Sequence, residues 1–160
     1  MNTNNVIQSQ YFAALEMLKQ VIVKCPAATW NAPGDSDPCW RKTYHALYYA
    51  HLYLQQKRQD FQPWEKHHDP DTDIPFSQPE VLEYLEFLQQ LVKKVVPSII
   101  LTDDSGFHWL PFDKLELQFY NIRHIQQHAG ELYERLGSRE KIELDWVSQT
   151  PKYLLDNIKE

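Results

Sequence analysis

Glycine is scarce in this chain, with four residues among 160. Loops that cradle phosphate groups depend on closely spaced glycines, and neither a G-x-G-x-x-G nor a Walker-type stretch occurs here. The sequence therefore argues against a nucleotide site of either kind.

Long apolar runs are also missing. The longest runs, such as VVPSIIL at residues 95–101, fall far short of the roughly 20 residues that span a bilayer. The first ten residues, MNTNNVIQSQ, lack the basic-then-apolar order of a secretory signal. The spacing of Cys25 and Cys39 leaves a disulfide open, but two reduced thiols are the simpler interpretation. We therefore expect a cytoplasmic protein with no membrane partner.

An excess of basic residues is absent as well. The chain has 16 lysines and arginines against 22 acidic residues, for a formal net charge of -6. A nucleic-acid binder needs a cationic stripe to displace counterions from phosphates, so we expect no nucleic-acid partner. Apolar residues make up 42% of the chain, which is typical of a globular core. The length fits a single domain covering residues 1–160.

What the sequence does contain is helical periodicity. Apolar residues recur at helical spacing and predict four helices. These span residues 4–24, 38 to about 58, 78–96 and 114–136. The last stretch, 138–160, has no strong periodic pattern, and we expect one or two short helical turns in it.

Capping residues support these boundaries. Asp37 precedes a proline, which is typical of an N-cap with proline at the first helical position. Ser77 and Glu80 have the spacing of a capping box. Asp113 is the expected N-cap of the fourth helix, and Gly137 is its expected end.

The connection between the second and third helices is long and rich in proline. It reads QDFQPWEKHHDPDTDIPFS at residues 59–77. Loops of this length in compact domains are usually functional or cross over the domain. Four amphipathic helices with one long link predict an all-α fold, a four-helix bundle in which helices 2 and 3 need not form a hairpin.

Two histidines in the fourth predicted helix lie one turn apart. His124 and His128 project from the same helix face, with their Cβ atoms about 6 Å apart. Such a pair can clamp a metal ion, and His45 in the second helix is the natural third ligand. His124 and His128 flank the apolar arc of their helix, where a substrate and solvent can reach them. That position suits an open coordination site.

Glu131 continues the histidine face of the fourth helix. It is the candidate catalytic residue, and it either orients a ligand or acts as a base. The sequence H-I-Q-Q-H lacks the glutamate of H-E-x-x-H, which disfavours metalloprotease chemistry. Histidines four residues apart also occur by chance, and His45 alone fits a buried structural histidine equally well.

The remaining histidines have other expected roles. His51 lies within the apolar stripe of the second helix and is expected to be structural. His67 and His68 belong to a polar loop and are expected to face water. His108, in GFHWLPF, either covers the site or packs against its neighbours.

Two segments resemble the DinB-like superfamily. CWRKTYHALYYAHLYL, at residues 39–54, is similar to its second helix, in which an aromatic residue precedes a histidine. FYNIRHIQQHAGELYERL, at residues 119–136, is similar to its fourth helix, with H-x-x-x-H followed by a small residue and glycine. The loop DFQPWEKHHDP also resembles the loop that follows helix 2 in one branch. The resemblance covers roughly residues 5–137.

The resemblance implies an up-down-down-up four-helix bundle, often a homodimer. It also implies a divalent metal, commonly nickel or zinc, on the residues that match the motif, His45, His124 and His128. Some members are S-transferases or isomerases that use low-molecular-weight thiols, and a metal would lower the thiol pKa. The superfamily name derives from DNA-damage induction and implies no DNA binding.

Three functions follow as hypotheses. The first is a metal-dependent enzyme of this superfamily, a thiol-dependent S-transferase or a hydrolase acting on a small molecule. The second is a non-catalytic bundle that binds a metal or small molecule in a stress response. The third is a structural dimer whose histidines only pack.

Overall fold

The computed structural model describes residues 2–69 and 74–156, and the described chain is all-α, as predicted. Within those ranges there is no strand, only an isolated antiparallel bridge between Asp104 and Asp113. The α-helices are α1 (Thr3–Lys24), α2 (Ala27–Trp30), α3 (Cys39–Tyr53), α4 (Gln78–Val95), α5 (Lys114–Glu140) and α6 (Lys152–Asp156). The 3-10 turns η1 (Arg58–Asp60) and η2 (Val96–Ser98) lie in the connections.

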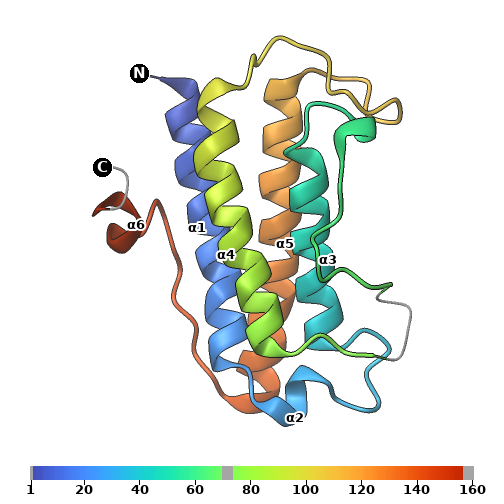
Figure 1. Cartoon of the computed structure of the whole chain (residues 1–160). Coiled ribbons are helices and arrows are strands. Elements are labelled where there is room, and N and C mark those ends of the chain that lie inside the picture. Colours follow the sequence, from blue (N-terminus) through green and yellow to red (C-terminus); the bar gives the residue numbers. More distant parts are fainter. Residues whose placement is uncertain (1, 70–73, 157–160) are drawn as a thin grey trace.

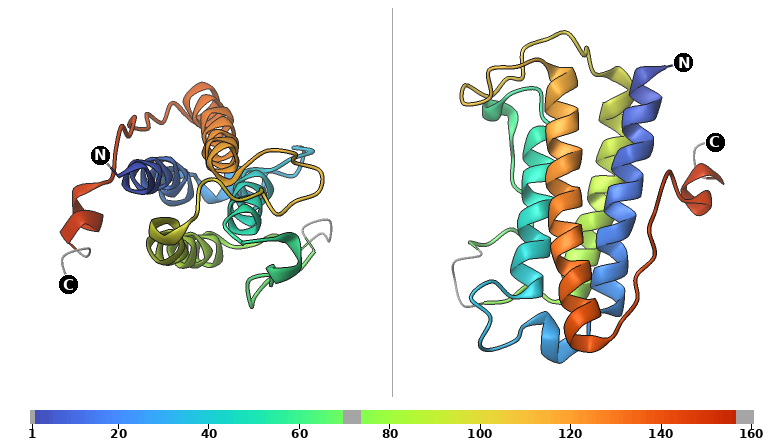
Figure 2. Two further views of the ribbon diagram at one scale, coloured as in Figure 1. Left: turned by 90° about the horizontal axis from the view of Figure 1, so that it is seen from above. Right: turned by 180° about the vertical axis from the view of Figure 1, so that it is seen from behind.

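The long helices α1, α3, α4 and α5 lie side by side (Figures 1 and 2). Helix α5 packs against both α1 and α3, and α4 packs against the same two helices. Figure 1 shows α3 and α4 running in one direction and α1 and α5 in the other. The connection between α3 and α4 returns along the length of the helices. This arrangement brings the middle of α3 next to the middle of α5.

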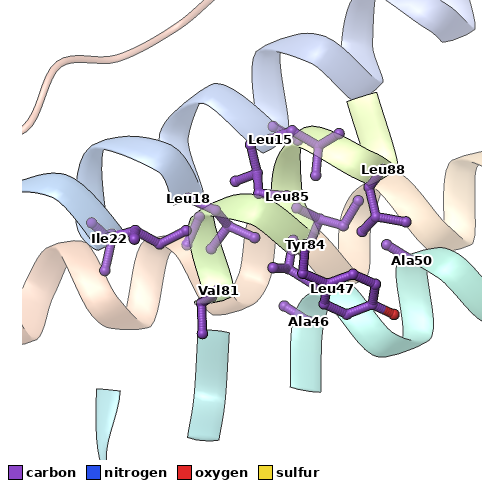
Figure 3. Packing of buried hydrophobic residues seen from close by; sticks show 14 of the residues in the cluster. Leu15, Leu18, Ile22, Ala46, Leu47, Ala50, Val81, Tyr84, Leu85 and Leu88 are labelled. Carbon is purple, nitrogen blue, oxygen red and sulfur yellow. The ribbon is translucent and has the colours of Figure 1, made fainter. Parts of the chain in front are cut away.

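The core is formed by the apolar faces of these helices. Figure 3 shows Leu15 and Leu18 of α1 packed with Leu85 of α4 and Leu47 of α3. Each of these side chains is at most 1% exposed. Full burial of such a side chain contributes about 1.5–3 kcal/mol, so the periodic apolar stripes are what hold the helices together.

A polar network inside the core joins three helices in the first two turns of α5. The Tyr11 hydroxyl of α1 donates to Gln118 Oε1 at 2.8 Å. Asn121 Nδ2 donates to the Tyr11 hydroxyl oxygen at 2.9 Å and to the Ala50 carbonyl of α3 at 3.2 Å. Because these groups are buried, a register shift of α5 would leave them unpaired at a cost of about 1–3 kcal/mol each. The network therefore fixes the register of α5 against α1 and α3 about one turn before His124.

Two of the predicted helix starts are confirmed and one is wrong. Ser77 and Glu80 form the predicted capping box, and the Asp113 side chain accepts from the backbone N–H of Glu116. Asp37 does not cap α3, because Pro38 is the N-cap residue and gives no side-chain bond. The Asp37 carboxylate instead pairs with Lys42, at 3.0 Å.

The second predicted helix is shorter than expected. Helix α3 ends at Tyr53 and not near residue 58. Lys114 is 2% exposed as a residue, and its ammonium group donates to the carbonyls of Gln55, Gln56 and Ser105 at 2.6–3.1 Å. These bonds hold the chain after α3 in a non-helical course and join it to the loop before α5.

The fourth predicted helix is longer than expected. Helix α5 continues through Gly137 to Glu140, and Lys141 takes the left-handed conformation with φ 57°. A glycine inside a helix costs only about 1 kcal/mol. Contacts beyond it offset that cost, since Arg139 pairs with Asp35 at 2.8 Å and Thr29 donates to Glu140.

After α5 the chain passes along the outside of α1 to α6 (Figure 2). Gln20 exchanges two hydrogen bonds with the backbone of Asp145, and Ser9 bonds to Thr150. Helix α6 confirms the expectation of a short helical turn in this region. Across the described residues, no helix combines the length and apolarity needed to cross a membrane.

Candidate metal centre

The three histidines singled out by the sequence come together between α3 and α5. His45, His124 and His128 each offer a ring nitrogen, and these atoms lie within 4.8 Å of one another. The ring centroids are 5.3 Å apart for His45 and His124, 5.0 Å for His45 and His128, and 4.6 Å for His124 and His128. The helix spacing that places two of them on one face of α5 also faces them toward His45.

The cluster could hold a metal ion. The Nε2 atoms of His124 and His128 are 3.1 Å apart. With Zn–N distances of about 2.0–2.1 Å and tetrahedral angles, ligand nitrogens lie about 3.3 Å apart. His45 is exposed while the other two rings are half-buried, so a side of the cluster faces solvent. Three histidines with an accessible side match the donor set of a site that keeps an open coordination position.

The electrostatics favour the neutral form of the His45 and His124 rings, which is the form that binds a metal. Burial, followed by the neighbouring histidines, lowers the pKa of His124 to about 4. Although His45 is exposed as a residue, partial desolvation of its ring among the neighbouring side chains, followed by the charge of His128, also lowers its pKa. The Nδ1 atom of His124 is buried without a hydrogen-bond partner among the described residues.

Glu131 lies behind the cluster and contacts His128. Its Oε2 atom is 3.1 Å from His128 Nδ1 and 2.7 Å from Lys42 Nζ. Lys42 also pairs with Asp37. The Lys42 ammonium, followed by the contact with His128, lowers the pKa of the Glu131 carboxyl to about 2. Glu131 is therefore an anion at neutral pH, placed to accept the Nδ1–H of His128.

The histidines open into a pocket of about 580 Å³. Its walls are formed by α3 and the preceding Asp37, by His67 and Asp69 of the long connection, and by His128 of α5. The lining residues are Asp37, Arg41, Lys42, Tyr44, His45, Tyr48, Tyr49, His67, Asp69 and His128. Tyr49 also packs against His45, with ring centroids 4.7 Å apart. The pocket thus combines two of the three histidines with aromatic walls and charged side chains.

The other histidines lie outside the cluster. His51 is buried in the core, with Nδ1 3.1 Å from the Tyr84 hydroxyl, and is structural as expected. His108 packs against Trp109 in the loop before α5 and lines a different pocket. Of the two alternatives for His108, the structure therefore supports simple packing.

The expectation that His67 and His68 face water is wrong. His67 is half-buried in the pocket wall, where its Nδ1 contacts the Tyr44 hydroxyl at 2.5 Å. His68 stacks on Phe76, with ring centroids 3.7 Å apart. The reason is that the long connection folds back over the aromatic face of α3. The polar residues of this loop do not indicate that it packs on α3. The aromatic residues Phe61, Trp64 and Phe76 around them are the signal that could have indicated it.

The chain matches no family model, and no curated protein or solved structure is detectably similar to it.

Proposed function

We propose that this chain is a divalent-metal-dependent enzyme of the DinB-like type, built as an up-down-down-up four-helix bundle. Three features support the proposal. The described chain is all-α, the α3 and α4 helices run in the same direction with a long connection between them, and the motif histidines converge. The convergence of His45, His124 and His128 beside an open pocket is the observation that carries it.

In this proposal His45, His124 and His128 hold the ion, for which zinc and nickel are the leading candidates. A divalent ion at such a site lowers the pKa of a bound water or thiol and so supplies a nucleophile near neutral pH. Glu131 acts as a positioning residue, because its charged oxygen fixes the ring of His128 and keeps Nε2 turned toward His124. A base role for Glu131 has less support, since that oxygen already accepts from two donors.

The proposed substrates are small molecules, and a low-molecular-weight thiol is the proposed cosubstrate. The pocket has room for a small molecule and lies directly against the histidines. Cobalt replacement tests this, because a thiolate bound to Co²⁺ gives an intense charge-transfer band in the near ultraviolet. We expect 2-mercaptoethanol to produce that band in the cobalt-loaded protein and not in His124→Ala.

A rate assay then tests catalysis itself. Transfer of 2-mercaptoethanol to a chlorodinitrobenzene should be faster with the zinc- or nickel-loaded protein than with the metal-free protein. A charge-transfer band without any rate increase in transfer or ester hydrolysis would favour the second hypothesis, a non-catalytic binding protein. One observation favours that alternative. Lys42 and Glu131, which lie beside the histidines, form an ion pair, so neither side chain is free to act as an acid or a base.

The proposal includes a homodimer. Large apolar side chains are exposed at the outer surface of α5 and on the segment after it, with Phe119 61% and Trp146 72% exposed. Both line a shallow pocket with Ile122 and Val147. Light scattering should give twice the chain mass of 19.1 kDa, and Phe119→Glu should shift the protein toward the monomer. A monomer at all concentrations would contradict this part of the proposal.

A further inference from the structure

Arg41 is the charged group of the metal pocket whose hydrogen bonds are least satisfied. Its Nε atom is buried and has no partner within the described residues. The guanidinium makes a long hydrogen bond, 3.4 Å from Nη1 to the Ser36 carbonyl. A buried donor without a partner costs about 1–3 kcal/mol, so this N–H is suited to a ligand that brings an acceptor.

Arg41 lies on the same face of α3 as His45. Arg41 and His45 are four residues apart on α3 and therefore lie on the same helix face, about 6 Å apart at their Cβ atoms. Both line the pocket, together with Tyr44 and Tyr48. The guanidinium lies over the Trp40 ring, 5.3 Å from its centroid, which holds the side chain in place.

The charge balance distinguishes Arg41 from its neighbour. Lys42 is neutralised by Asp37 and Glu131, at 3.0 and 2.7 Å. Arg41 forms no ion pair with any residue that the structure describes. Asp69 also lines the pocket and is a carboxylate that an anionic ligand would have to tolerate.

We propose that Arg41 forms an anion subsite, so that the ligand of this pocket carries an anionic oxygen group about one helical turn from the atom that meets the metal. A guanidinium recognises such groups through paired N–H donors, which a lysine cannot offer. Carboxylate, sulfonate and phosphonate groups share this chemistry. The inference rests on the proposed function for the role of the histidines, but the anion subsite exists with or without the ion.

The test is therefore made first on the metal-free protein. The ¹H–¹⁵N signal of Arg41 Nε–H is assigned by its loss in Arg41→Lys and followed while benzoate, phenylphosphonate or neutral benzamide is added. We expect a saturable shift with the two anions and none with benzamide. The comparison of benzoate with phenylphosphonate tells a carboxylate subsite from a phosphate-type subsite.

Calorimetry on variants gives the second readout. Arg41→Gln should weaken binding of the preferred anion at least tenfold, whereas the exposed Arg58→Gln should leave it unchanged. Equal binding of benzoate and benzamide, or full affinity in Arg41→Gln, would overturn the inference.

The outcome is separable from that of the metal proposal. If zinc does not bind but the anion response of Arg41 is present, the proposed function fails and the subsite stands. If zinc binds with all three histidines but Arg41 does not respond to anions, the subsite fails and the metal proposal stands.

Discussion

A single oxygen atom, Oε2 of Glu131, lies between Lys42 of α3 and His128 of α5, at 2.7 Å from Nζ and 3.1 Å from Nδ1. It thereby connects the two helices that carry the histidine cluster. A carboxylate that accepts the second ring N–H of a metal-ligating histidine fixes the tautomer and the orientation of the ring. The orientation of this ring is what places His128 Nε2 beside His124 Nε2.

Replacing this carboxylate should weaken metal binding without removing a ligand. Glu131→Gln keeps the size of the side chain but loses the charge that holds both donors. We expect metal affinity to fall about 10- to 100-fold, as is usual for residues behind a ligand. Competition with a chromophoric chelator measures the affinity, and the exposed Glu134→Gln on the same helix is the matched control. Equal affinities for the two variants would contradict the positioning role.

His51 should make the fold sensitive to acid. Burial lowers the pKa of His51 to about 4 in the folded protein, while an unfolded histidine titrates near 6.5. As the pH falls from about 6.5 toward 4, the unfolded chain gains a proton that the folded chain does not. Stability is therefore lost through that window, by on the order of 3 kcal/mol for this residue.

Urea denaturation of the metal-free protein at several pH values tests this. His51→Phe should be less stable at neutral pH, because the Tyr84 hydroxyl loses its partner, but its stability should depend less on pH. His108→Phe, at an exposed histidine, should keep the slope of the parent protein. An unchanged slope in His51→Phe would show that another group is responsible.

Lys114 should be a major contributor to stability although it is charged. Its side chain is buried, and its ammonium group donates to three backbone carbonyls, two just after α3 and one in the loop before α5. Lys114→Met keeps much of the volume and leaves these carbonyls without a donor. We expect a loss of about 3 kcal/mol in the free energy of unfolding, whereas the exposed Lys57→Met should change it by less than about 0.5 kcal/mol. A loss below about 1 kcal/mol for Lys114→Met would mean that water replaces the ammonium group.

The sequence predicted the helices and the cluster because both depend on periodicity. Histidines four residues apart on a helix must share a face, and the apolar stripe fixed which way that face turned. The apolar stripe of the second helix does not include His45, so its position opposite them was expected only as that of the natural third ligand and from the family resemblance. These are local patterns that tertiary packing preserved.

What the sequence did not predict depends on contacts between distant residues. The end of α3 is set by Lys114, about 60 positions later, and the extension of α5 past Gly137 by contacts with Asp35 and Thr29. Asp37 has the residue type and position of a cap, yet the ion pair with Lys42 competes for it. The wall formed by His67 was not predicted either, because no periodic pattern specifies how a long loop folds.

Metal analysis of the protein purified without a histidine tag tests the central claim most directly. Elemental analysis by mass spectrometry, after addition of zinc or nickel and removal of excess ion, counts the ions bound per chain. We predict one divalent ion per chain in the parent protein and in His108→Ala, and loss of that ion in His124→Ala and His128→Ala. A parent protein that retains no stoichiometric ion, or a His124→Ala variant that retains as much as the parent, would contradict the account.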